Sequence, residues 1–164
     1  MSVPYNGVRD IKAAFLFSCF TGLRYSDLQR ITLADLHKDT IGTYLDISMV
    51  KTKEKLKAYV PTVALSMVPE RERTDNEPMF NLPKNDYANV CLRRWIESAQ
   101  IDKTITFHLA RHTAATLLLS SGLPLAVVSK QLGHLKISTT EIYAKIVDEA
   151  QVEAAKTMDN IIHV

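Results

Sequence analysis

Apolar residues recur along this chain mostly at the spacing of helices. From Val8 to Phe20 they return every three or four positions, and a second clear repeat runs from Asp86 to Ala99. Thr43 to Val50 instead alternates, which predicts a strand with one buried face, and Lys57 to Val60 is a shorter partner strand. Residues 62–83 carry several prolines around a charged centre, which predicts a short helix and a long surface loop. The pattern predicts a mainly α fold with a small antiparallel β-hairpin, an α+β domain.

Glycines divide the C-terminal third of the chain into three predicted helices. Gly122 breaks the first helix, Pro124 opens the second, and Gly133 closes it. Ser138 and Glu141 have the S-x-x-E spacing of a capping box, which predicts the start of the third helix at this point. The segments on both sides of each glycine are therefore brought close together, and their side chains can meet.

Composition changes this picture little. With 164 residues and 46% hydrophobic residues, the chain fits one globular domain, and it contains no apolar run of membrane-spanning length. Cys19 and Cys91 lie in predicted helices and indicate a reduced cytoplasm rather than a disulfide framework. The net charge of +2 is too small to indicate nucleic-acid binding by itself. One basic cluster stands out within seven residues: Lys51, Lys53, Lys55 and Lys57.

Candidate chemistry is concentrated in the predicted C-terminal helices. His108 and Arg111 are three residues apart, so on a helix they share a face and can reach one ligand. His134 follows the helix-ending glycine, and Tyr143 lies just inside the third helix. A helix start also carries free N–H groups and suits an anion. Taken singly, these residues are ordinary packing and surface residues.

A zinc site is a weak alternative for the first of these helices. His108 and His112 have the i, i+4 spacing of a metal-binding pair. However, the sequence HLARH lacks the glutamate of the metalloprotease helix, and the neighbouring Arg111 opposes a cation. We therefore expect no metal here.

The order of these motifs resembles the tyrosine recombinases of the phage integrase family. H-x-x-R, then L-G-H, then a tyrosine form the C-terminal signature of that family, and TGLRYSDL at residues 21–28 matches its upstream arginine box. Overall, the sequence is most similar to integrases of Bacteroides-type mobile elements. The resemblance implies the tyrosine-recombinase catalytic-domain fold. In the TGLRYSDL box we expect Asp27 to bond the local backbone or orient an arginine.

The resemblance also implies roles for five residues. Arg24 and Arg111 would neutralise the non-bridging oxygens of a DNA phosphodiester, since guanidinium groups bind phosphate in a bidentate way. His108 and His134 would donate to the same oxygens or accept the phenolic proton. Tyr143 would attack phosphorus and form a 3′-phosphotyrosine. No metal, ATP or other cofactor would be needed.

In the family, a lysine on the hairpin protonates the leaving 5′ oxygen. Here two criteria disagree: Lys51 has the K-T context, whereas Lys53 has the usual eight-residue spacing to Pro61. We prefer Lys51, in a hairpin two residues longer than usual, and keep Lys53 in reserve.

By resemblance, residues 1–164 form a single catalytic domain without the family's N-terminal DNA-clamping domain. Residues 1–7 would be the end of the linker, and residues 148–164 a C-terminal helical tail that docks on a neighbouring protomer. The expected partners are double-stranded DNA and, in the full-length enzyme, three further copies in a tetramer on DNA. The isolated domain is expected to be monomeric and to come from a bacterial cytoplasm, at the nucleoid.

Two other classes of function remain open from the sequence. A type IB topoisomerase uses nearly the same residues and would relax supercoiled DNA as a monomer. A non-catalytic DNA-binding helical domain is the other alternative, although it would not need five such residues around one phosphate.

Overall fold

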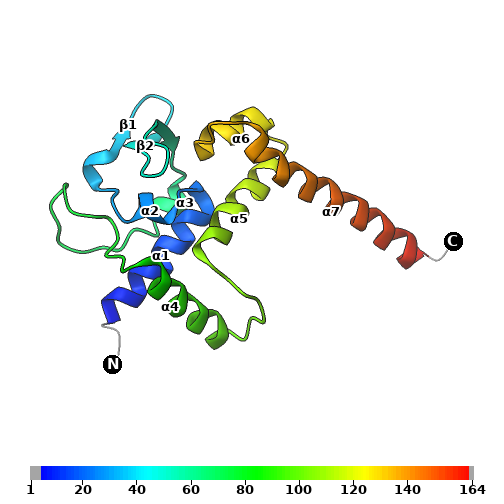
Figure 1. The fold of residues 1–164 in the computed structure, drawn as a ribbon, viewed down its shortest axis with the longest axis horizontal. Helices are drawn as coiled ribbons and strands as arrows, with labels where there is room; N and C mark the ends of the chain where they lie inside the picture. Colours follow the sequence, from blue (N-terminus) through cyan, green and yellow to red (C-terminus); the bar gives the residue numbers. More distant parts are fainter. Residues whose placement is uncertain (1–4, 163–164) are drawn as a thin grey trace.

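Seven α-helices and one three-stranded sheet make up the computed structural model, which describes residues 5–162 (Figure 1). The elements follow in chain order: α1 Tyr5–Thr21, α2 Tyr25–Leu28, the 3-10 turn η1 Leu33–Asp35, β1 Leu36–Lys38, β2 Thr43–Ser48, β3 Lys55–Tyr59, α3 Thr62–Leu65, α4 Asn85–Ser98, α5 Phe107–Ser120, α6 Leu125–Leu132 and α7 Ser138–Ile162. The predicted mainly helical α+β class is therefore confirmed. None of the helices within residues 5–162 has the length and apolar composition needed to cross a membrane.

The sheet contains one strand more than the predicted hairpin. Its order is β1-β2-β3 with antiparallel pairing, and Leu45 of β2 pairs with Leu36 on one side and Ala58 on the other. The alternating face of β2 is buried as predicted at Leu45 and Ile47. β1 was missed because it has only three residues and two of them are exposed, so its pairing with β2 rather than its own pattern makes it a strand.

The main core lies where α1, α4 and α5 meet. The Phe15 ring of α1 packs edge-on against Phe107 of α5, with centroids 5.7 Å apart, and against Trp95 of α4 at 6.3 Å. Aromatic pairs favour this edge-to-face geometry. Trp95 is therefore part of the core packing, as its place on the apolar face of the predicted helix indicated.

The long connection between α3 and α4 is exposed over most of its charged centre, as predicted, but its end is buried. Met79 and Phe80 are fully buried in the main core. Arg71 donates a 2.6 Å hydrogen bond to the buried carboxylate of Asp10 on α1, and its second nitrogen donates to the carbonyl of Met79. Burying a carboxylate is tolerated when it is paired in this way. The charged residues thus anchor the loop to α1.

The turn between α6 and α7 starts at Gly133 as predicted, but its other end, at Ser138, differs from the prediction. Gly133 ends α6 in the left-handed conformation (φ 65°), as predicted, and a Cβ there would lie 2.5 Å from Met49 Sδ. Ser138, in contrast, is the first residue of α7 and not the residue before it. The N–H groups of Thr139 and Thr140 already bond to the carbonyls of residues 136 and 137, so the helical turn starts too early for the predicted capping box.

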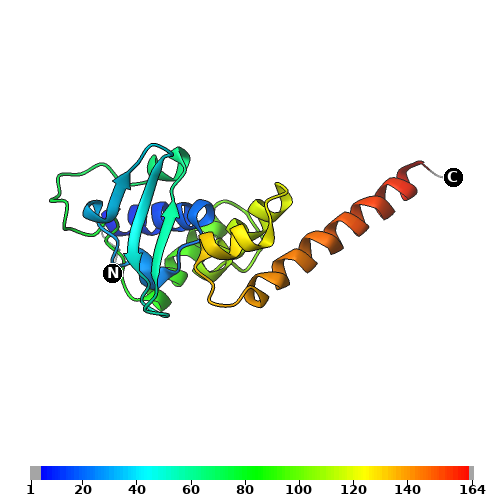
Figure 2. The ribbon, with the colours of Figure 1, turned by 90° about the horizontal axis from the view of Figure 1, so that it is seen from above.

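α7 is one continuous helix of 25 residues, and the expected separate tail segment is its second half. Figures 1 and 2 both show this half running away from the rest of the molecule. At the other end of the chain, residues 5–7 of the expected linker are already part of α1, and residues 1–4 lie outside the described residues.

Arg111 connects three parts of this fold. Its side chain is only 3% exposed, and its two terminal nitrogens each donate a 2.7 Å hydrogen bond, one to the carbonyl of Gly22 and one to that of Leu132. These carbonyls lie at the C-terminal ends of α1 and α6, where helices have carbonyls without partners in the helix. Arg111 therefore binds the α1–α2 turn and the end of α6 to α5.

We expect Arg111→Lys to lower the free energy of unfolding by about 2–3 kcal/mol, because one ammonium cannot serve both buried carbonyls. Arg24→Lys is the matched control, since Arg24 is only partly buried, and it should change stability by less than about 1 kcal/mol. Urea unfolding at pH 7 measures both. Equal losses in the two variants would contradict the structural role of Arg111.

Candidate active site

Arg24 lies in the turn between α1 and α2, where buried neighbours hold the backbone. Leu23 and Leu28 are both fully buried, and the Ser18 hydroxyl donates a 2.7 Å hydrogen bond to the carbonyl of Leu23. The Arg24 side chain is partly exposed, and its Nη1 lies 3.3 Å from Met49 Sδ. The packing predicted for this turn therefore exists, and it directs the guanidinium toward the end of the β2–β3 hairpin.

The two guanidinium groups of Arg24 and Arg111 lie close enough to repel each other. Burial, and then the charge of Arg24, lower the pKa of Arg111 to about 10. Tyr143 and Asp27 partly offset this effect. Arg111 stays protonated at neutral pH, and neither arginine forms an ion pair with a carboxylate among the described residues. An anion bound between them would relieve this repulsion, and guanidinium groups match the geometry of phosphate oxygens.

Tyr143 belongs to a second, smaller core formed by α5, α6 and α7. Its side chain is 4% exposed and packs with Ala115, Val128 and Leu132. Burial raises the pKa of the phenol, whereas Arg111 and Arg24 act to lower it. The phenol is thus neutral at pH 7, and positive charge from the two arginines favours its ionised form.

His134 is held in place by a residue that sequence reasoning missed. Its Nδ1 lies 2.7 Å from the hydroxyl of Thr140, which is fully buried in the first turn of α7. Burial and then the charges of Arg111 and Arg24 lower the pKa of His134 to about 4, so the ring is neutral at pH 7. Its plane is parallel to that of Tyr143, with centroids 6.4 Å apart. In the sequence, the only hint of this contact was that Thr140 follows the L-G-H motif closely, six residues after His134.

His108 differs from Arg111 in its surroundings, although the two lie three residues apart on α5. Arg111 is buried beneath the turn, whereas His108 is exposed. His108 reaches the other residues through His112: the two imidazoles meet edge-on at 4.5 Å, and His112 meets Tyr143 edge-on at 5.1 Å. Sequence reasoning considered His112 only as a zinc ligand.

Lys51 and Lys53 are both exposed in a four-residue turn over residues 50–53. Ser48 still pairs with Lys55, and the N–H of Met49 donates to the carbonyl of Glu54. β3 therefore begins two residues earlier than predicted, and the expected longer hairpin is a tight turn. Lys53 takes a left-handed conformation (φ 62°), the place a glycine usually fills.

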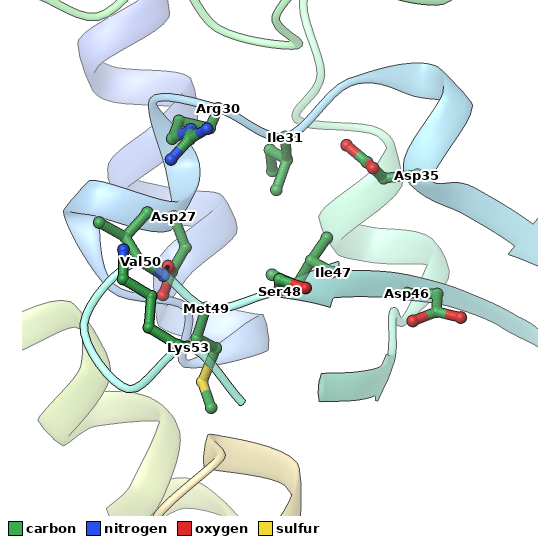
Figure 3. Close-up of a pocket in the computed structure, with 10 residues that line it drawn as sticks. All are labelled: Asp27, Arg30, Ile31, Asp35, Asp46, Ile47, Ser48, Met49, Val50 and Lys53. Atoms are coloured by element: carbon green, nitrogen blue, oxygen red, sulfur yellow. Dashed lines mark hydrogen bonds between the residues drawn. The ribbon is translucent and has the colours of Figure 1, made fainter. Parts of the chain in front are cut away.

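Asp27 ties this turn to the arginine box. It is 2% exposed, and its Oδ1 accepts a 2.8 Å hydrogen bond from the N–H of Val50. Asp27 is therefore a structural partner of the backbone, but the bonded residue lies on the distant hairpin and not, as we predicted, in the local backbone. Figure 3 shows Asp27, Val50 and Lys53 around a cavity of about 420 Å³ that also includes Arg30. Lys53 thus lines a cavity that none of the other candidate catalytic residues lines.

The remaining lysines of the basic cluster differ in their surroundings. Lys57 bonds to Asp39 at 2.9 Å, and its ammonium lies 3.8 Å from the centroid of Tyr44. This pair holds the pKa of Asp39 well below its usual value and raises that of Lys57. Lys55 and Lys130 line a cavity of about 490 Å³ beside His134. Basic groups therefore border the site from both the hairpin and α6.

No group of three or more His, Cys, Asp or Glu side chains within the described part of the chain could hold a metal ion. Cationic groups dominate instead. A phenol, two guanidinium groups and a neutral imidazole, gathered at the junction of α1–α2, α5 and α6–α7, can bind a phosphodiester and support nucleophilic attack on phosphorus.

Comparisons with known proteins agree with the family resemblance of the sequence motifs. Residues 5–150 match the model of the phage integrase family. A tyrosine recombinase of Thermosipho africanus is 27% identical over 153 residues, covering 90% of this chain and 53% of that protein. The tyrosine recombinase XerD of Oceanobacillus iheyensis is 32% identical over 143 residues, covering 77% of this chain and 46% of that protein. The chain thus spans about half the length of these relatives.

Among solved structures, the XerH site-specific recombinase bound to its palindromic difH substrate in a post-cleavage complex superposes with a TM-score of 0.70. The match covers 97% of this chain and 48% of that chain at 20% identity, so it concerns the fold. The family model covers most of the chain, from the start of α1 to the middle of α7. The chain therefore belongs to the phage integrase family and has the fold of a tyrosine-recombinase catalytic domain.

Proposed function

We propose that this chain is the catalytic domain of a site-specific DNA recombinase that cleaves and rejoins DNA through a 3′-phosphotyrosine. The observation that carries the proposal is the position of Tyr143, buried next to His134 and within the electrostatic reach of Arg24 and Arg111. The two free cysteines support a bacterial cytoplasm as the compartment. The narrower assignment to Bacteroides-type mobile elements is supported by the sequence motifs alone.

In the proposed reaction, the phenolic oxygen of Tyr143 forms a bond to phosphorus while the bond from phosphorus to the 5′ oxygen breaks. Arg24 and Arg111 stabilise the negative charge that develops on the non-bridging oxygens. The phenolic proton goes to His134, whose ring is neutral at pH 7 and whose pKa would rise when a bound phosphate offsets the charges of Arg24 and Arg111. His108, exposed at the start of α5, donates to a non-bridging oxygen. Lys51 gives a proton to the leaving oxygen, and the reverse steps rejoin the strand without ATP.

We expect Tyr143→Phe to abolish covalent attachment to DNA and to leave the fold intact, because it removes only the attacking hydroxyl. Nicked suicide duplexes with a sequence-randomised crossover region, followed by denaturing gels, would capture the adduct and select the preferred site. Tyr44→Phe is the control, since it removes a hydroxyl from β2. A wild-type chain without adduct on any duplex of the library, or an adduct with Tyr143→Phe, would refute the proposal. Relaxation of supercoiled DNA by the monomer without site preference would favour a type IB topoisomerase.

The general acid can be tested with a bridging 5′-sulfur at the scissile position, which leaves without a proton. Lys51→Ala should cut ordinary DNA slowly and recover on the sulfur substrate. Lys53→Ala should resemble the wild type on both substrates. Arg24→Lys is the control and should stay slow on both, because its charge acts on the non-bridging oxygens. Rescue of Lys53→Ala alone would identify Lys53 as the acid.

We also propose that the domain acts in a tetramer on double-stranded DNA, with the second half of α7 docked on a neighbouring copy. The helix carries large exposed apolar side chains along its length: Ile142, Ile146, Val152 and Met158. The same chain has an apolar groove of about 450 Å³ between the sheet and α5–α6, lined by residues such as Phe20, Leu118 and Val127. Because α7 leads away from the body (Figure 2), the matching groove is that of another copy.

Met158→Asp should therefore prevent assembly of several copies on a two-site duplex without lowering adduct formation on a single suicide site. An aspartate at this position would have to be desolvated in the groove. Gln151→Asp, which adds the same charge to an exposed polar position, is the matched control. Sedimentation of the protein–DNA complexes measures the assembly, and normal assembly with Met158→Asp would contradict docking through this part of α7.

A further inference from the structure

His112 has no role in the reaction described above, yet it is the side chain that links two of its residues. It lies one residue after Arg111 on α5 and is partly buried. Its imidazole contacts His108 edge-on, with centroids 4.5 Å apart and planes at 84°. On its other side it contacts the Tyr143 ring at 5.1 Å and 75°. The three rings form a continuous row from the exposed start of α5 to the buried phenol.

The Tyr143 ring depends on such contacts for its orientation. Its phenolic oxygen has no hydrogen-bond partner among the residues that the structure describes. The ring is instead placed between two imidazoles, His134 with a parallel plane and His112 with a nearly perpendicular one. His134 is held by its contact with Thr140, and His112 lies on α5 between His108 and Tyr143. The ring is therefore oriented while its oxygen stays unbonded.

The surroundings of His112 keep it uncharged. Burial, followed by the charges of His108 and Arg111, lowers the pKa of His112 below its ordinary value of 6.5. The titratable or charged groups that face it are these two on α5 and Tyr143 on α7. A neutral ring can pack against the phenol without adding a further positive charge beside Arg111.

We propose that His112 is a positioning residue for the nucleophile: its ring holds Tyr143 and His108 in register, so that the phenolic oxygen faces the phosphate bound by the arginines. This inference rests on the proposed function of Tyr143. The contribution is steric, so an aromatic ring without nitrogen should replace the imidazole. A small displacement of a reacting atom is enough to slow an enzymatic step severely.

The test uses the complete chain prebound to the selected suicide duplex, with cleavage followed in a single turnover. His112→Ala should lower the cleavage rate roughly ten- to a hundredfold, the range expected for a misplaced nucleophile. His112→Phe should restore a rate close to wild type. Thr113→Ala, which removes a hydroxyl that bonds to the carbonyl of Leu109 on the same helix, is the control and should cleave normally. DNA affinity and thermal unfolding of all variants should stay near those of the wild type.

The bridging-sulfur substrate separates positioning from proton transfer. If His112 positions Tyr143, His112→Ala is slow on both substrates, since the sulfur removes only the need for a leaving-group proton. Recovery of His112→Ala on the sulfur substrate would overturn the inference, as would wild-type cleavage by His112→Ala. If His112→Ala fails to fold, the folded His112→Phe decides, because a slow His112→Phe overturns the steric role. A wild-type chain that forms no adduct would refute the proposed function itself.

Discussion

The buried guanidinium of Arg111 is the interaction on which the rest of this structure depends. It supplies hydrogen bonds to the carbonyls of Gly22 and Leu132, and thereby joins two turns that are far apart in the sequence. One of these turns presents Arg24, and the other precedes His134. A buried charge is stable only with such partners. The same bonds that satisfy Arg111 therefore bring the candidate catalytic residues to one place.

A second constraint acts through the hairpin. Asp27, inside the arginine box, accepts a hydrogen bond from the N–H of Val50. Met49 lies against both Arg24 and Gly133. The turn that carries Lys51 is thus attached to α2 through a buried carboxylate and to the α6–α7 turn through a buried thioether. The turns that carry Arg24 and Lys51 are therefore held by buried polar and sulfur contacts.

The charged groups of the candidate site favour the binding of an anion. Arg111, His112 and His134 all have lowered pKa values, in each case because burial and neighbouring positive groups oppose a further positive charge. The phenol of Tyr143 has a raised pKa, mainly because of burial. A bound phosphate would compensate the two arginines and leave the histidines free to exchange protons near neutral pH. Binding of an anion would therefore lower the electrostatic free energy of the site.

By itself, the sequence determined the class of fold, the helix ends at Gly122 and Gly133, and the set of candidate residues, because periodicity and motif spacing are local properties. It could not reveal β1, which becomes a strand only by pairing with β2, or the burial of Met79 and Phe80, which lie at the end of a charged and mostly exposed connection. The tertiary structure also decided that Arg111 is buried while His108 is exposed, and that Lys53 lines a separate cavity. It brought Thr140 to His134 and His112 to Tyr143. These outcomes depend on strand pairing and on tertiary contacts, which have no periodic signal in the chain.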